Sequence, residues 1–545
     1  LIITIYIYKI FGYQIYFWGE LNTSFRYLNI IKFPPAKHCS SYQSLAREIA
    51  ANYFKKYNKR WSGDIFREDY IKKVIDIKIT DYYAFEQTIE DLSSNEDHVK
   101  RLSPHLLSAI YHDKISSIKL VILLYYPFLV FRLTAVFLRS IFLSLVSKKK
   151  LKASSIIYLR KKVYPDMGEY KYLSENLNIV NTSEIIGIYP FPSRLREKYG
   201  FYFISSIKGM TLNFIFSYIK SLKNSFYNLS FFLKNGVDQS IFHAFCFDTF
   251  RSNSILSLSP SIICGQLLDK PLYILLSKHK LKSTKVVSIN ESFRYPPNRS
   301  FDFSHLDKYY SMNKIDENMQ NTYGGDIKHF HQVEFFRKGQ PTELTNDLSE
   351  AIKSYKYSIV LATGQIFVER GGYNFWGYDE VEKFLKVSLG LASVFKDVLF
   401  VVKGKKGELK RMPEWFDTLA CKSNNIYVIN SDRPKDLKYN NFEALMDNVD
   451  LLISSAHIST TIWQAIARNK AAIAINDIHP PSILSEFKAY ECNLDELKDT
   501  ILYWMSLSNL EVYKSTEIMK ERFNIGTSDG LREVVEDLQL LLKKD

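Results

Sequence analysis

The stretch that decides the fold is VDLLISSAHISTTIWQAIARNKAAIAIN, residues 449–476. It holds two short, mostly apolar runs, Val449–Ser454 and Ala471–Asn476, on either side of a segment with helical periodicity, Thr460–Asn469. Apolar runs without regular polar alternation are typical of strands in a parallel sheet that helices cover on both faces. The stretch therefore predicts a strand–helix–strand unit of such a sheet.

The same alternation extends upstream. Further strands are expected at Tyr357–Thr363, Val398–Lys403 and Asn425–Asn430, and helices at Asp379–Phe395 and Phe442–Asp447. This series predicts one α/β domain over residues 346–510, followed by a helical tail at 511–545. The polar stretch Arg337–Glu343 suits a linker between this domain and residues 1–340. In that N-terminal half, Lys285–Ile289 (KVVSI) is the run that reads as a strand.

Composition excludes several classes of protein. The chain has 545 residues, 46% hydrophobic and 24% charged, which rules out wholesale disorder and suits two to four domains. Its five cysteines are odd in number and form no CxxC or Cys/His cluster, so we expect neither a disulfide framework nor a zinc site, and a reducing compartment. The chain begins at Leu1 without a signal-peptide pattern, and we expect its first strand to be cut short.

Two apolar and basic segments lie in the N-terminal half, at 120–146 and 201–235. The first is long enough to span a bilayer, but Arg132 and Arg139 fall on one helical face, and Lys148–Lys150 follow. An apolar face beside a cationic one suits a helix lying on an anionic leaflet. We expect peripheral contact with an anionic membrane surface; the alternatives are buried core helices with snorkelling lysines, or a true span.

Residues that follow parallel strands lie at the carboxyl edge of a sheet, where ligands of doubly wound folds bind. After Val449–Ser454 comes a run of small hydroxyl residues with one His, directly before a helix, and Lys403 ends another strand. Hydroxyls, helix N–H groups and an ammonium together suit a phosphate. The alternative is that Ser459 or Thr460 merely caps the helix. Neither GxGxxG nor GxxxxGK[ST] occurs, so dehydrogenase and P-loop NTPase classes lack their fingerprints.

Residues 448–477 resemble the donor-binding segment of GT-B-fold glycosyltransferases, and VVKGK (Val401–Lys405) is similar to that family's basic element. The resemblance implies an α/β, GT-B-like fold of two Rossmann-like domains facing a cleft, here with helical basic and aromatic insertions in the N-terminal half. It implies donor-binding roles for Lys403, Ser455, His457, Ser459, Thr460, Thr461 and Gln464. Gln464 stands where the family has an acidic ribose-binding residue, and Asn469-Lys470 replaces its usual glycine turn.

The resemblance implies that the N-terminal half binds the acceptor and supplies acid/base groups, for which the candidates are Glu291 and Asp248. Glu291 follows the predicted strand Lys285–Ile289; His243, Asp302 and His305 are further candidates. No DxD follows a predicted donor-domain strand, so we expect no metal and no cofactor. The stretches Pro190–Gly200 and Asn290–Pro297 resemble surface-polysaccharide biosynthesis proteins of bacteria.

The resulting hypothesis is a hexosyl- or ulosonic-acid-transferring glycosyltransferase of capsule or O-antigen type. It would use a nucleotide-sugar donor and a glycan or lipid-linked acceptor at the inner face of the cytoplasmic membrane. The alternatives are a sugar-nucleotide 2-epimerase and a non-catalytic polysaccharide-assembly protein with a degenerate donor site, which Gln464 favours. The net charge of +14 also permits a nucleic-acid binder, but the cations cluster with apolar residues, so we expect no nucleic-acid partner.

Overall fold

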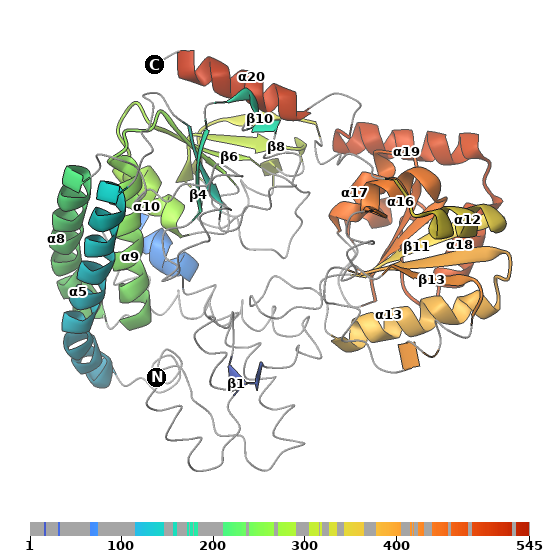
Figure 1. Ribbon diagram of the computed structural model, residues 1–545, viewed down its shortest axis with the longest axis horizontal. Coiled ribbons are helices and arrows are strands. Elements are labelled where there is room, and N and C mark those ends of the chain that lie inside the picture. The colour runs from blue at the N-terminus through green and yellow to red at the C-terminus, as the bar shows by residue number, and fades with distance from the viewer. Residues whose placement is uncertain are drawn as a thin grey trace, which may run out of the picture.

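The computed structural model contains two α/β lobes (Figure 1). It describes residues 16–17, 31–32, 66–74, 115–146, 156–160, 172–173, 175–177, 179–183, 211–235, 239–265, 271–289, 305–314, 317–318, 326–334, 343–363, 378–404, 415–416, 418, 423–429, 439–455, 459–477, 482–525 and 530–543. The linker predicted at 337–343 lies largely outside these ranges. Within them, two separate sheets of six parallel strands confirm the predicted α/β class with two Rossmann-like domains.

The second sheet is the one that the sequence predicts. Its strand order is β13-β12-β11-β14-β15-β16. The strands are β11 (Tyr357–Ala362), β12 (Val398–Lys403), β13 (Ile426–Ile429), β14 (Leu451–Ser454), β15 (Ala471–Ile475) and β16 (Glu491–Cys492). Every pairing is parallel, as expected, and each predicted strand agrees with the observed one to within two residues.

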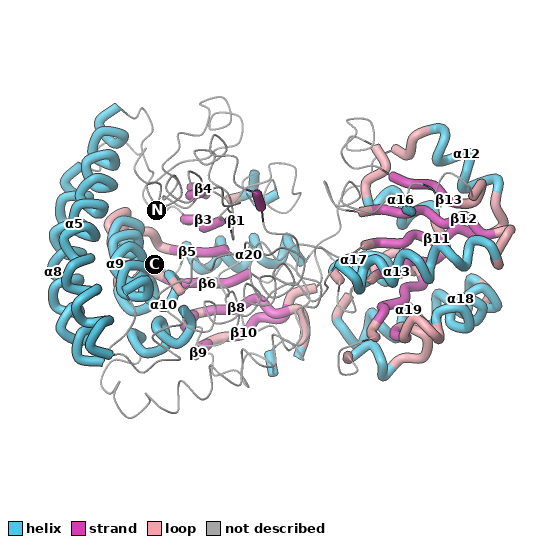
Figure 2. Tube along the Cα trace, turned by 90° about the horizontal axis from the view of Figure 1, so that it is seen from below, coloured by secondary structure: helices cyan, strands magenta, loops and turns pink. Residues whose placement is uncertain are grey.

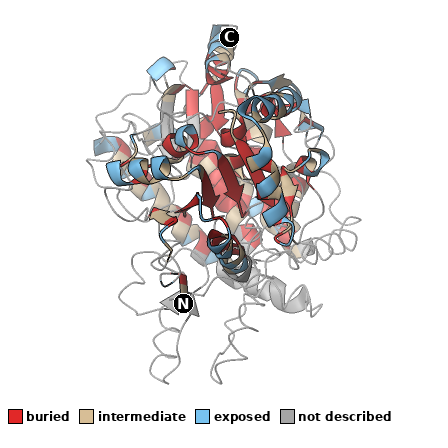
Figure 3. Cartoon of the chain, turned by 90° about the vertical axis from the view of Figure 1, so that its right-hand side faces the viewer, coloured by how far each residue is buried: buried red, intermediate tan, exposed pale blue. Residues whose placement is uncertain are grey.

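Helices cover both faces of this sheet. They are α12 (Asn346–Ser354), α13 (Tyr378–Gly390), α16 (Phe442–Asn448), α17 (Thr460–Ile466), α18 (Leu497–Ser506) and α19 (Asn509–Phe523), with the 3-10 turns η5 (Leu391–Ser393) and η7 (Ile483–Glu486). Figure 3 shows buried strands between helices whose outer sides are exposed. This two-sided burial explains why the strands are continuous apolar runs.

The first sheet has the order β10-β8-β6-β5-β3-β4. Its strands are β3 (Ile156–Arg160), β4 (Ile179–Ser183), β5 (Ile262–Gly265), β6 (Lys285–Ile289), β8 (Lys308–Ser311) and β10 (Phe330–Gln332). Two further parallel pairs are separate sheets, β1 (Tyr16–Phe17) with β2 (Ile31–Lys32) and β7 (His305–Leu306) with β9 (Asp326–Ile327). The strand predicted at Lys285–Ile289 is β6.

Alternate residues of the first sheet face two different cores. Ile157, Ile263 and Val286 pack with residues of α8 (Thr211–Asn235), α9 (Gln239–Leu256) and α10 (Leu272–His279). Their neighbours in sequence face the other way, toward α20 (Gly530–Lys543). Because successive side chains of a strand point to opposite faces of the sheet, each strand contributes alternate residues to each of the two helical layers.

Helix α20 crosses from the second half of the chain to the first sheet (Figure 1). Leu531, Val534 and Leu538 are buried there, and Lys308 donates to Asp537 at 2.6 Å. A Cβ at Gly530 would lie 2.2 Å from the carbonyl oxygen of Glu334, so glycine permits this close approach. Helix α19, by contrast, packs in the core of the second lobe through Met519 and Phe523. The two helices of the segment 511–545 thus belong to the cores of different lobes.

Three long helices lie on one side of the first lobe, and two of them form its outer surface. Helix α5 (Ile115–Val146) contains the predicted segment 120–146, and α8 (Thr211–Asn235) covers most of 201–235. In Figure 2, α9 lies between these two helices and the sheet. Residues 201–210 lie outside the described ranges.

Candidate functional site

Three neighbouring strands of the second sheet end in register. Ala362 of β11 pairs with Lys403 of β12 on one side and with Ser454 of β14 on the other. The Thr363 N–H donates to the Lys403 carbonyl at 3.3 Å, and the Ser455 N–H donates to the Ala362 carbonyl at 3.0 Å. The structure therefore places Lys403, Thr363 and Ser455 side by side at the carboxyl edge.

This edge faces the first lobe. Helix α17, which follows β14, lies on the side of the second lobe nearest the first lobe in Figure 2. Helix α12, which leads into β11, lies on the far side. Ligands of doubly wound sheets bind at the carboxyl edge, so the site residues lie where a ligand could contact both lobes.

The hydroxyl run before α17 serves the helix itself. Ser459 is the N-cap, and its Oγ accepts a hydrogen bond from the Thr461 N–H at 3.3 Å. The Ser459 and Thr461 hydroxyl oxygens lie 2.6 Å apart. Ser459 thus caps α17, while Thr460 opens the helix beside it. His457 lies outside the described residues.

The Lys403 ammonium is positioned by a buried asparagine. Its Nζ donates to the carbonyl oxygen of Asn440 at 3.0 Å. Asn440 is fully buried and has φ 55°, in the left-handed region. Its side chain accepts from the Thr345 N–H at 2.8 Å and donates to the Thr345 hydroxyl at 3.2 Å. The start of the second lobe and the end of β12 are joined through this one residue.

Gln464 lies one turn into α17 and is 8% exposed. Its Nε2 donates to the carboxylate of Glu443, in the first turn of α16, at 3.0 Å. The position where GT-B transferases have an acid thus holds an amide, but a carboxylate lies in direct contact with it.

The other departure, at Asn469, has a backbone explanation. Asn469 has φ 56°, which glycine and asparagine adopt more readily than other residues. The Lys470 N–H donates to the Ala465 carbonyl at 3.0 Å and closes the end of α17. Asparagine therefore adopts the left-handed conformation that a glycine would adopt at this turn.

The two acid/base candidates have different outcomes. Glu291 lies outside the described residues, two positions after the end of β6. Asp248 is on α9, in the helical layer, and accepts hydrogen bonds from Tyr70 and Arg251, each at 2.8 Å. Burial, and then the Asp248 carboxylate, raise the pKa of Tyr70, so Tyr70 stays a neutral donor. These contacts give Asp248 a structural role between helical segments.

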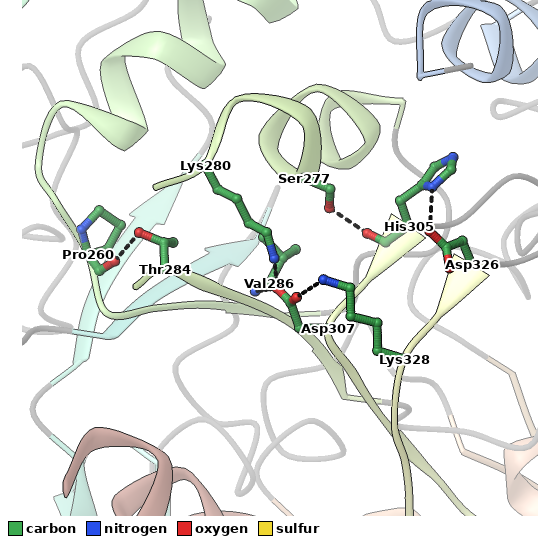
Figure 4. Close-up of polar contacts among 9 residues, drawn as sticks. All are labelled: Pro260, Ser277, Lys280, Thr284, Val286, His305, Asp307, Asp326 and Lys328. Atoms are coloured by element: carbon green, nitrogen blue, oxygen red, sulfur yellow. Dashed lines mark hydrogen bonds and ion pairs between the residues drawn. The ribbon is translucent and has the colours of Figure 1, made fainter. Parts of the chain in front are cut away.

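His305 lies at the amino edge of the first sheet, near α10 (Figure 4). Its Nε2 is 2.8 Å from an Asp69 carboxylate oxygen, and its Nδ1 is 3.4 Å from one of Asp326. The amino edge is opposite to the ligand-binding edge of a parallel sheet. His305 is therefore not placed to act on a ligand between the lobes. Asp302 and the side chain of His243 lie outside the described residues.

Beside His305, the Asp307 carboxylate joins the starts of two strands (Figure 4). It accepts from Lys280, from the Val286 N–H at 2.8 Å and from Lys328 at 3.0 Å. Burial alone would raise the pKa of Asp307, but these three hydrogen bonds outweigh burial and lower it.

This lowered pKa predicts acid sensitivity. A depressed folded-state pKa stabilises the protein above the unfolded value near pH 4, and the stabilisation is lost as the pH falls through the folded value. We expect Asp307→Asn to cost about 2 kcal/mol at pH 7 and to remove part of the decline in stability below pH 4. Thermal unfolding recorded from pH 7 to pH 3 measures the stability at pH 7 and its decline in acid. Asp499→Asn, at an exposed position, is the control. Parallel pH curves for Asp307→Asn and the unmodified protein would contradict the assignment.

Sequence reasoning missed Asn440 and Glu443. Both lie at the start of α16, where the pair Asn440-Asn441 precedes an apolar run; Asn441 indeed caps the helix by accepting from the Ala444 N–H at 2.8 Å. That cap signal could have placed Glu443 in a first helical turn at the carboxyl edge. Among the described residues, no group of three or more His, Cys, Asp or Glu is arranged to hold a metal ion.

No protein-family model matches the sequence, and no curated protein matches it either. Solved structures are similar to it at low identity and with TM-scores under 0.5. A UDP-GlcNAc 2-epimerase from Neisseria meningitidis is 12% identical, with TM-score 0.41, covering 71% of this chain and 99% of its own. The wall teichoic acid polymerase TagF is 12% identical, with TM-score 0.38, covering 80% and 99%. A UDP-glucosyltransferase from Polygonum tinctorium is 9% identical, with TM-score 0.37, covering 73% and 99%. The chain is thus similar in arrangement to enzymes of two kinds, glycosyltransferases and a 2-epimerase.

Proposed function

We propose that this protein is a glycosyltransferase that takes a hexosyl or ulosonic-acid residue from a nucleotide-sugar donor. The observation that carries the proposal is the in-register ending of β12, β11 and β14. It gathers one ammonium, from Lys403, with the hydroxyl residues Thr363 and Ser455 at the ligand-binding edge. A cation among hydroxyl and N–H donors suits the phosphates of a nucleotide, and charge develops on those phosphates when the glycosidic bond breaks.

The neighbouring residues extend the proposed site. Thr460 and Thr461 open α17 at the same edge and would contribute hydroxyls to the phosphates. Gln464 and Glu443, 3.0 Å apart, offer an amide and a carboxylate for ribose hydroxyls. The acceptor would be a surface glycan of capsule or O-antigen type, or its lipid-linked precursor, bound on the side of the first lobe.

The proposal is tested by thermal-shift screening against UDP, CMP, GDP and ADP sugars. A donor present at 100 times its dissociation constant should add about 2.7 kcal/mol of stability. The double variant Thr460→Ala/Thr461→Ala should lose most of that shift while its unfolding without ligand changes little. Ser354→Ala/Ser393→Ala, with exposed hydroxyls on the elements that lead into β11 and β12, is the matched control.

Products then separate the alternatives. Incubation of the binding sugar nucleotide with glycan or lipid-linked acceptors should give transfer. Interconversion of the donor without an acceptor would identify a 2-epimerase instead, and binding without turnover would identify a non-catalytic assembly protein. Absence of any nucleotide-sugar shift would overturn the donor site itself.

A further inference from the structure

The outer face of α5 is apolar and exposed. Phe131, Leu138, Phe142 and Leu145 recur every three to seven residues along one side of the helix, and Phe131 is 69% exposed. Among the described residues, the window Leu129–Val146 is long and apolar enough to cross a membrane, yet only 22% of it is buried. Buried core helices with snorkelling lysines, one alternative from the sequence, would show the opposite burial.

The outer face of α8 continues this surface. Five large apolar residues on it are exposed: Leu212, Phe216, Ile219, Phe226 and Tyr227. Helix α8 packs directly against α5, and both lie outside α9 (Figures 1 and 2). The two helices therefore form one surface, here called the α5–α8 face, made of these residues and the exposed apolar residues of α5.

The inner side of the same helices combines large apolar residues, among them Leu133 and Phe214, with several small polar ones. Ser217, Ser221 and Ser225 of α8 are buried. Ser217 donates to the carbonyl of Asn253 on α9 at 3.1 Å, and the Asn253 side chain donates to the Ser221 hydroxyl at 3.0 Å. On α5, Ser140 and Ser144 are likewise buried. The buried serines therefore hydrogen-bond within the lobe, whereas large apolar side chains are exposed on the opposite side. Helices that face lipid share this placement of small polar residues at their protein contacts.

The charge of the two helices completes the description. Helix α5 contains three basic residues, helix α8 contains three more, and neither helix contains an Asp or Glu. Lys220 and Lys223 are exposed on α8, next to Ile219 and before Phe226. Cations within an exposed apolar surface match the headgroups of anionic lipids, which also attract basic residues from a distance.

We propose that the α5–α8 face docks on an anionic lipid bilayer and lies in its interfacial region. Helix α5 packs against α8 and α9, and its Thr134 hydroxyl lies 2.7 Å from that of Tyr218, so the helix belongs to the lobe rather than crossing a membrane alone. Docking would hold the enzyme at the inner face of the cytoplasmic membrane, close to a lipid-linked acceptor. The proposal goes beyond the donor site and does not depend on it.

The test is cosedimentation of the full chain with vesicles of phosphatidylglycerol and phosphatidylethanolamine, compared with phosphatidylcholine vesicles. We expect binding to the anionic vesicles. Phe142→Ser/Phe216→Ser should weaken it at least about 100-fold, because each large side chain contributes roughly 1.5–3 kcal/mol when buried and about 1.4 kcal/mol is tenfold. Leu510→Ser/Ile518→Ser, equally exposed on α19, is the matched control and should bind as the unmodified protein does.

Charge is tested separately. Lys220→Glu/Lys223→Glu should weaken binding at least about 20-fold, since each cation near the surface contributes about 1 kcal/mol, whereas Lys353→Glu/Lys356→Glu should not. No vesicle binding, or binding that resists alkaline carbonate as a spanning helix does, would overturn the proposal. So would a dimer that Phe142→Ser/Phe216→Ser dissociates. Nucleotide-sugar shifts measured on the same variants keep its failure distinct from failure of the donor site.

Discussion

Lys403→Ala is expected to lower the turnover of sugar transfer about 100-fold. Lys403 ends β12 at the carboxyl edge, beside the ends of β11 and β14, where its ammonium would stabilise the charge of the departing nucleotide phosphate. Removing one preorganised donor from such a charge typically costs about 100- to 1000-fold in rate. The measurement is turnover at saturating donor, using the nucleotide sugar that the thermal-shift screen identifies.

Two controls sharpen this experiment. Lys353→Ala removes an exposed lysine from α12, on the side of the sheet opposite to the proposed site, and should leave turnover unchanged. Because Lys403 also donates to Asn440, the thermal unfolding of Lys403→Ala must be recorded as well. Full turnover by a folded Lys403→Ala protein would remove Lys403 from the site.

Asn440→Ala is expected to lower the free energy of unfolding by about 2–5 kcal/mol. The left-handed backbone at Asn440 disfavours alanine by about 1–2 kcal/mol. Loss of the amide also leaves the Thr345 N–H without the oxygen that accepts its hydrogen bond, which costs about 1–3 kcal/mol in a buried position. Chemical denaturation measures the sum.

Asn440→Gly separates the two contributions. Glycine accepts the left-handed backbone, so this variant should lose only the hydrogen-bond part and be more stable than Asn440→Ala. Asn448→Ala, at the exposed end of α16, serves as the control and should change stability by less than about 1 kcal/mol. Equal stability of the Ala and Gly variants would show that the backbone conformation contributes nothing.

The second sheet could be predicted from the sequence because burial on both faces makes its strands readable. Runs such as Val398–Lys403 are apolar at nearly every position, and helices with clear periodicity separate them. The first sheet gave weaker signals. Strand β8 reads KYYS, which combines a lysine, two tyrosines and a serine, and β4 reads IVNTS, with three polar residues. Such strands form through packing between distant segments, which a local pattern does not contain.

In the candidate site, too, some features could be predicted from the sequence and others depend on tertiary packing. That Lys403 and Ser455 share one edge follows from parallel strands, and the register confirms it. The contacts of Lys403 with Asn440 and of Gln464 with Glu443 could not be predicted, since they depend on how α16 packs beside its neighbours. The polarity of α5 and α8 was visible as composition, but which face points outward required the three-dimensional arrangement.

The return of α20 to the first sheet sets an order for folding during synthesis. Tyr310 of β8 and Asp537 of α20, which form a hydrogen bond, are 227 positions apart in the chain. A ribosome at ordinary speed, roughly 5–20 residues per second, needs ten seconds or more to make that interval. During this time the second lobe emerges from the ribosome, and the face of the first sheet that will pack against α20 lacks that helix. The core between α20 and the first sheet therefore cannot be completed before α20 has left the ribosome.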